Sequence, residues 1–149
     1  MRPSLLIVLG LAVATMASAK PAIATDPRTH PDLCGFLAGT YIVVGKKVDS
    51  GQTYFGRVIL RQNKEGLQVE RIIGGKRLRG EGRIEHALGS DAADVLRVRF
   101  VHQGEKYEIT YLWRSDLDNY ARLSGYVYKP GIQTDTPGLE VLFIDPQML

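Results

Sequence analysis

About eight short runs of alternating apolar and polar residues fill the chain between residues 41 and 144, and each run ends in a break containing Gly, Asp or Asn. A strand and a turn in roughly every dozen residues, with no helical period between them, are typical of an all-β fold. The breaks Gly74-Gly75 and Gln103-Gly104 favour two-residue hairpins, because glycine takes the positive φ that such turns require. Consecutive strands are therefore predicted to be antiparallel neighbours.

The alternation also predicts which side chains face inward. In one run Leu96, Val98 and Phe100 share one face, while Arg97 and Arg99 share the other. An apolar and a charged face on each strand predict a single up-and-down antiparallel barrel with a wet outside, and a β-sandwich would give the same pattern. The simple succession of hairpins favours the barrel. Its predicted strands are residues 40–47, 52–62, 66–73, 76–86, 94–102, 106–114, 119–128 and 139–145. The side chains expected inside include Leu96, Val98, Phe100, Ile109, Tyr111, Leu123 and Val127.

The first 32 residues are expected to lie outside the barrel. A positive start and an apolar stretch over residues 5–13 precede the small-residue cleavage site Ala17-Ser18-Ala19. This predicts a secretory signal peptide over residues 1–19, too short for a membrane span, with Ala24 as an alternative cleavage point. Residues 20–32 contain three prolines and no apolar period, so they predict a poorly ordered leader. Residues 33–149 form the predicted barrel domain of an exported protein, periplasmic or secreted.

Composition excludes some classes of function. The net charge of +3 is too small for a dedicated nucleic-acid binder. The single cysteine, Cys34, cannot form an internal disulfide; we expect a buried apolar residue, with a free thiol or an intermolecular bridge as alternatives. It lies in a short apolar turn at residues 33–38 that could plug one end of the barrel.

No catalytic or metal motif is apparent. His30, His86 and His102 stand too far apart in sequence for metal-ligand spacing. The Asx-rich turn at residues 116–119 lacks the Gly and the Glu of a calcium loop. Ser124 has neither the nucleophile motif around it nor a nearby His. We therefore predict a protein that is not an enzyme and that carries no metal or cofactor.

Arg71 is the most informative single residue. It shares parity with Leu67, Val69 and Ile73, so regular pairing would point its guanidinium into the barrel. A buried charge needs a partner, which would be a carboxylate, backbone carbonyls or a ligand anion. A bulge at Gly74-Gly75 or a place at the rim would instead turn Arg71 outward. The predicted ligand-binding residues are Arg71, Tyr54, Tyr107, Tyr111 and Trp113.

Glycines at inward positions affect how much free space the barrel interior has. Gly56, Gly80, Gly82 and Gly125 all fall at inward positions. They allow either strong coiling of the strands or free space beside large aromatic side chains.

Two outer surfaces are candidates for partner binding. Arg77, Arg79, Arg83, Arg97 and Arg99 alternate with acidic residues, which predicts either a solvated, ion-paired surface or a site for an anionic partner. A second row contains aromatic residues with one arginine, a composition typical of interaction surfaces. This predicted interaction surface consists of Tyr120, Arg122, Tyr126 and Tyr128.

Gly39-Thr40-Tyr41, which follows a short apolar turn and opens the first strand, resembles the Gly-x-Trp start of lipocalin-like (calycin-type) barrels. The resemblance implies a barrel that binds a hydrophobic small molecule. We therefore expect a non-catalytic binding protein that holds a small amphipathic, hydrophobic or anionic ligand. The alternative is a secreted interaction or inhibitor module that uses the leader and the Tyr/Arg surface on a protein or envelope partner.

Overall fold

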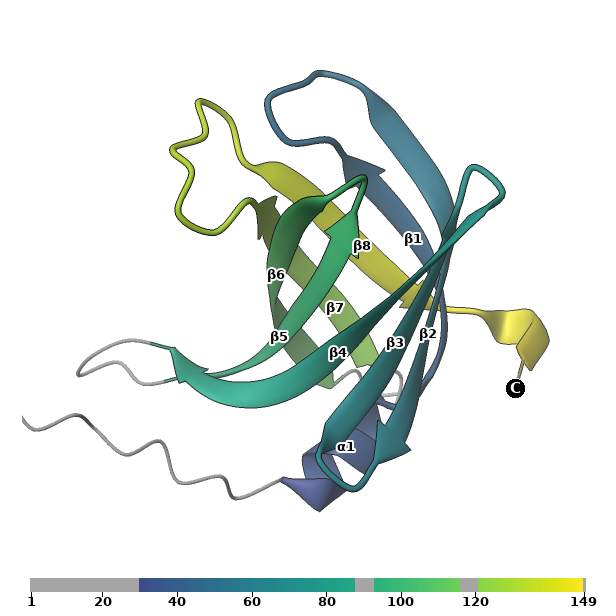
Figure 1. Ribbon diagram of the computed structural model, residues 1–149. Helices are drawn as coiled ribbons and strands as arrows, with labels where there is room; N and C mark the ends of the chain where they lie inside the picture. Colours follow the sequence, from purple (N-terminus) through teal and green to yellow (C-terminus); the bar gives the residue numbers. More distant parts are fainter. Residues whose placement is uncertain (1–29, 88–92, 116–120, 149) are drawn as a thin grey trace, which may run out of the picture.

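The computed structural model describes residues 30–87, 93–115 and 121–148, and its strands close into one up-and-down antiparallel barrel (Figure 1). Each strand pairs with its neighbours in sequence, and β1 pairs with β8 to complete the ring. The all-β barrel prediction is confirmed, and the sandwich alternative fails because the sheet closes on itself. The strands are β1 (Gly39–Lys46), β2 (Thr53–Asn63), β3 (Gly66–Ile73), β4 (Lys76–Ala87), β5 (Ala93–His102), β6 (Glu105–Ser115), β7 (Ala121–Tyr128) and β8 (Gly138–Ile144).

The ends of the strands follow the turn residues of the sequence. Gly74 and Gly75 have φ values of 55° and 75°, and Gln103 and Gly104 have 53° and 81°. These left-handed conformations make the tight turns between β3 and β4 and between β5 and β6. Observed and predicted strand ends differ by one residue at most, apart from the predicted start of β7, which lies outside the described residues.

The interior is packed by the side chains that share inward parity. Across β5 and β6, Leu96 lies opposite Tyr111 and Val98 opposite Ile109. All four are buried, as are Leu123 and Val127 on β7, whereas Phe100 is half-buried toward one end of the barrel. Each large apolar side chain removed from water contributes roughly 1.5–3 kcal/mol to folding. The predicted interior face is therefore confirmed.

A short helix covers one end of the barrel. Helix α1 (Pro31–Leu37) lies across this end in Figure 1 and buries Cys34 and Leu37 against the core. The hydroxyl of the fully buried Tyr41 donates a hydrogen bond to the carbonyl oxygen of Leu37 at 2.9 Å. The helix begins two residues before the predicted turn at residues 33–38, with Pro31 in its first turn, where a missing N–H costs nothing. At the other terminus a 3₁₀ turn, η2 (Pro146–Met148), follows β8.

Close approach of neighbouring strands explains three of the four inward glycines. A Cβ atom on Gly56 would lie 2.2 Å from the carbonyl oxygen of Ile72. A Cβ atom on Gly125 would lie 2.3 Å from the carbonyl oxygen of Thr110, and one on Gly80 would lie 2.5 Å from that of Arg99. Only a residue without a side chain allows the adjacent backbone to come this near. Strand coiling therefore accounts for Gly56, Gly80 and Gly125. At Gly82 the nearest atoms belong to side chains of the core instead.

Candidate ligand-binding site in the barrel

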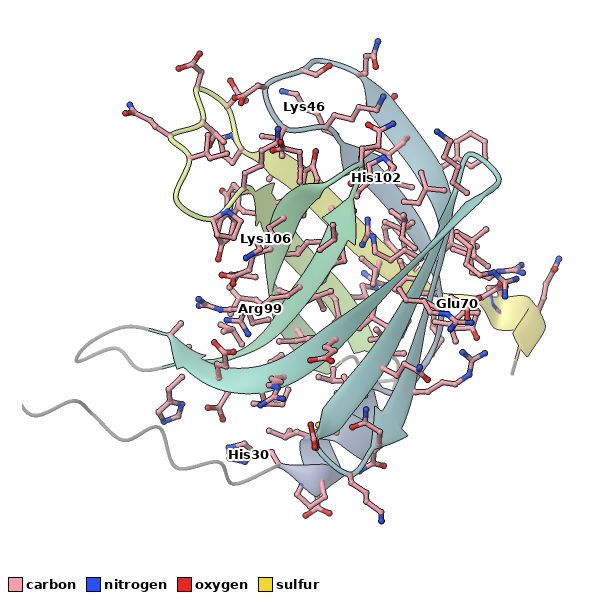
Figure 2. The ribbon with its side chains drawn as sticks, in the orientation of Figure 1. His30, Lys46, Glu70, Arg99, His102 and Lys106 are labelled. Carbon is pink, nitrogen blue, oxygen red and sulfur yellow. The ribbon has the colours of Figure 1, made fainter. Side chains whose placement is uncertain are left out.

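A cavity of about 870 Å³ opens at the end of the barrel opposite α1. The turn residues 47–49, 74–76 and 102–103 form its rim, together with Lys129 after β7. Figure 2 shows His102 at this end of the molecule and His30 at the end covered by α1. The barrel is thus a cup, closed below by the helix and the packed core and open above.

A buried ion pair forms the floor of the cup. The guanidinium of Arg71 on β3 donates to both carboxylate oxygens of Glu140 on β8, with a distance of 3.0 Å from Nη1 to Oε2. The hydroxyls of Tyr54 and Tyr111 also donate to this carboxylate. Arg71 is 3% exposed and Glu140 1% exposed. Two-pronged pairing with two added hydroxyls satisfies all the acceptor positions of the carboxylate, which is the condition for burying an ion.

The surroundings of the pair fix its protonation state. Burial alone would raise the pKa of Glu140, but the charge and hydrogen bonds of Arg71 and the two hydroxyls hold this pKa below its ordinary value. Burial, and next the charge of Glu140, raise the pKa values of Tyr54 and Tyr111. The floor therefore contains a carboxylate, a guanidinium and two protonated phenols at neutral pH.

One donor of Arg71 is left over. Its Nε is buried and has no hydrogen-bond partner among the described residues. The guanidinium carbon lies 4.8 Å from the ring centre of Phe100, and both residues line the cavity. A buried donor without an acceptor is costly, so this N–H is an unfavourable feature of the floor.

The lining of the cavity is mainly apolar and aromatic. Phe100 and Tyr107 stack with ring centres 5.3 Å apart and planes at 9°, and both line the cavity beside Ile73 and Leu78. The rim, in contrast, is cationic. Its charged members are Lys47, Lys76 and Lys129 against the single carboxylate of Asp49, with His102 as a titratable neighbour.

The structure places the five predicted ligand-binding residues at different depths. Arg71 points inward with a carboxylate partner, which confirms the inward alternative for its orientation. Arg71, Tyr54 and Tyr107 line the cavity, and Tyr111 lies beneath it in contact with Glu140. Trp113 packs against the core and is not among the cavity-lining residues. That these five residues bind a ligand stays a prediction.

Sequence reasoning did not identify Glu140. The signal was present in β8, because Glu140 shares inward parity with the fully buried Leu142. Its pairing with Arg71 could not be predicted from local sequence, because the two residues are 69 positions apart.

The predicted Tyr/Arg surface lies on the outer face of β7, where Arg122 and Tyr126 are exposed. Tyr128 is half-buried because its hydroxyl donates to Glu108 and contacts the hydroxyl of Thr110 at 3.1 Å. Tyr120 lies outside the described residues. Of the three described members of this surface, Arg122 and Tyr126 are exposed and Tyr128 is half-buried.

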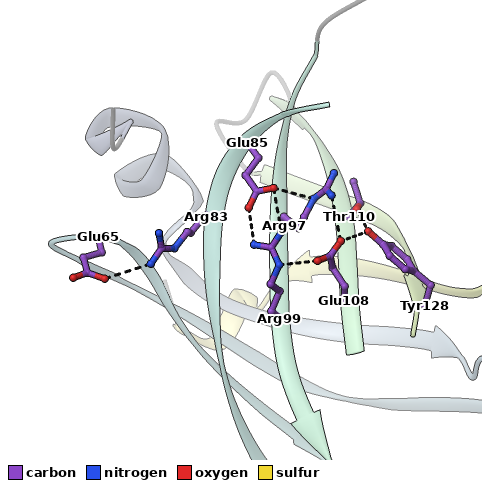
Figure 3. A network of polar contacts seen from close by, with 8 residues as sticks. All are labelled: Glu65, Arg83, Glu85, Arg97, Arg99, Glu108, Thr110 and Tyr128. Atoms are coloured by element: carbon purple, nitrogen blue, oxygen red, sulfur yellow. Dashed lines mark hydrogen bonds and ion pairs between the residues drawn. The ribbon is translucent and has the colours of Figure 1, made fainter. Parts of the chain in front are cut away.

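The outer faces of β4, β5 and β6 form a network of ion pairs (Figure 3). Arg99 lies between Glu85 and Glu108 at 2.6 Å from each, and Arg97 bridges the same two carboxylates at 3.2 Å. Burial opposes ionisation of Glu108, but Tyr128 and the arginines hold its pKa below the ordinary value. This arrangement supports the solvated, paired surface rather than a site for an anionic partner.

Within the described residues, no three His, Cys, Asp or Glu side chains cluster as a metal site would require. None of the helices in residues 30–87, 93–115 and 121–148 is long and apolar enough to cross a membrane. Neither a protein-family model nor a curated protein sequence matches the chain significantly.

Proposed function

We propose that this protein is a non-catalytic, lipocalin-like binding protein that holds one small amphipathic molecule in its cup. The observation that carries the proposal is the cavity of about 870 Å³, which lies within the range of small-molecule sites. The cavity lining is mainly apolar and aromatic, and its few polar groups lie at the floor and at the rim. This arrangement is usual in small-molecule sites. The signal peptide predicted over residues 1–19 supports action outside the cytoplasm, in the periplasm or after secretion.

The charges favour one orientation of the ligand. At the floor, Glu140 already balances the charge of Arg71, so this depth favours an uncharged part of the ligand. At the rim, Lys129 pairs with Glu105 at 3.3 Å, and Lys47 and Lys76 still outnumber Asp49, which favours an acidic group. A molecule with an apolar body and an acidic head near the rim fits both conditions.

Blocking the cup tests the proposal. Leu78→Trp would place an indole into the cavity, and Val101→Trp adds the same side chain to an exposed position on the outer face of β5. Isothermal titration with long-chain fatty acids, their methyl esters and aromatic acids should show binding to the wild type and to Val101→Trp. Leu78→Trp should lose at least tenfold in affinity, equivalent to about 1.4 kcal/mol. If the wild type binds nothing in the panel, or if both variants bind equally, the cup is not the site.

The orientation has its own test. Lys76 at the rim and Lys106 outside the cavity are both exposed lysines, so Lys76→Gln and Lys106→Gln form a matched pair. Lys76→Gln should weaken binding of a fatty acid about two- to fivefold, as expected for an exposed ion pair worth up to about 1 kcal/mol. Binding of the corresponding methyl ester should not change. An equal loss for acid and ester would place the head group elsewhere.

A further inference from the structure

Opposite the ion-pair network, the outer face of the barrel carries a group of exposed apolar side chains beside Lys46 and Arg57, although the sequence pattern predicts a polar outer face for every strand. We call this surface the apolar wall. It consists of Ile42, Val44, Phe55, Tyr126, Leu139 and Phe143, all exposed. Phe55 is 80% exposed and Tyr126 58%, which is unusual for aromatic side chains on a regular sheet.

These residues are neighbours across four adjacent strands. Val44 on β1 lies opposite Phe55 on β2 and Val141 on β8. Ile42 lies opposite Phe143, and Leu139 opposite Tyr126. Because directly opposed side chains on one face are in reach of each other, the wall is continuous rather than a scatter of single residues.

The wall is large enough to be an interface. An aromatic side chain buries about 150–250 Å², so the exposed parts of Phe55, Tyr126 and Phe143 amount to roughly 270–450 Å². The aliphatic members extend this area toward the roughly 800 Å² that each side of a standard protein interface buries. Apolar patches above a few hundred Å² mark interaction sites.

The edge of the wall is complementary to itself. A groove of about 390 Å³ opens beside Ile42, lined also by Ile72 and by an Arg57–Asp145 ion pair at 3.1 Å. One surface thus carries projecting aromatic rings and a groove that can receive a ring, with the half-exposed guanidinium of Arg57 beside them. A two-fold axis brings such features of one copy onto their counterparts in the other. We propose that the protein forms a symmetric homodimer through the apolar wall.

Matched charge substitutions test this dimer. Val44→Glu places a carboxylate within the wall, and Val101→Glu places one at an equally exposed valine on the charged half of the barrel. Light scattering on a sizing column should show a wild-type dimer at about 100 μM, well above the micromolar constants of the weakest standard interfaces. Val44→Glu should raise the dimer dissociation constant at least tenfold, because burial of a carboxylate in an apolar interface is costly. Val101→Glu should remain dimeric.

A second variant separates the interface from folding. Phe55→Ser removes the most exposed ring, which contributes little to the fold of one copy. The variant should therefore have the melting temperature of the wild-type monomer, and its dimer should dissociate more readily. A monomeric wild type at the stated concentration would overturn the proposal. So would dimers of undiminished affinity in both Val44→Glu and Phe55→Ser. If the wild type is monomeric and co-sediments with phosphatidylcholine vesicles, and Val44→Glu does not, the apolar wall would be a membrane-binding surface instead.

Discussion

Arg71 and Glu140 depend on each other inside the barrel. An apolar pair can often replace a buried ion pair when both members are exchanged. Arg71→Leu alone would instead leave Glu140 as a buried carboxylate with only two phenols as partners. Breaking a buried pair on one side costs far more than replacing both of its members.

We predict that Arg71→Leu lowers the free energy of unfolding by about 3–5 kcal/mol. The double variant Arg71→Leu/Glu140→Leu should recover most of this loss, because no uncompensated charge remains. Urea denaturation of the two variants measures both values. Arg77→Leu, which breaks an exposed pair with Glu70, is the control and should change stability by about 0.5 kcal/mol or less. An Arg71→Leu variant as stable as the wild type would show that the floor does not depend on the pair.

The same pair should make the protein sensitive to acid. In the folded state the pKa of Glu140 lies below the ordinary value of 4.5, which applies to the unfolded chain. Its ionised form therefore stabilises the fold above pH 4.5, and this contribution is lost as the pH falls through the folded pKa. Unfolding titrations between neutral pH and pH 3 should show a steeper loss in the wild type than in Arg71→Leu/Glu140→Leu. Glu108 is present in both proteins, so parallel curves would remove Glu140 as the cause.

At the scale of elements, the hairpins could be predicted because one or two residues determine each turn. Gly74-Gly75 and Gln103-Gly104 fix two turns, and alternation then fixes the parity of the strands between them. Helix α1 was missed because seven residues are too few to show a helical period, and its N-cap has no side-chain hydrogen bond. The apolar wall was missed because β1 and β8 are apolar on both faces, as Ile42 and Leu139 show.

Close strand packing gives a prediction for β7. Gly125→Ala would force a Cβ against the backbone of β6, 2.3 Å from the Thr110 carbonyl oxygen. We expect a loss of about 1–3 kcal/mol in the free energy of unfolding, the range of overpacked sites. Gly51→Ala is the control, since its Cβ would meet nothing within 4 Å. Equal melting temperatures for the two variants would mean that the sheet relaxes freely at Gly125.

At the scale of the whole molecule, closure gives every strand a partner on both sides. A sheet edge would fray, and a closed ring has none. We predict that the amides of Val141 and Leu142 on β8 exchange with solvent as slowly as those of Leu96 and Val98 on β5. Native-state hydrogen exchange followed by NMR measures this directly. Faster exchange confined to β8 would show that the β1–β8 seam opens locally.

The candidate site could be predicted only in part for a related reason. Parity placed Arg71, Tyr54 and Tyr107 inside, because parity is a local property of a strand. The identity of the partner carboxylate depends on which strands face each other across the ring, and no short stretch of sequence contains that information. Cavity volume is likewise set by the packing of all the strands together.

The position of Glu140 in the last strand has a consequence for the order of folding. A growing chain completes β1 to β7 before β8 exists, and each hairpin among them can form from neighbouring residues. During that time the guanidinium of Arg71 has no counter-charge and favours a hydrated, unfinished interior. When β8 pairs with β1 and β7, it brings the carboxylate of Glu140 to Arg71 and closes the barrel in a single step. Folding should therefore be all-or-none and late, with the C-terminal strand as its trigger.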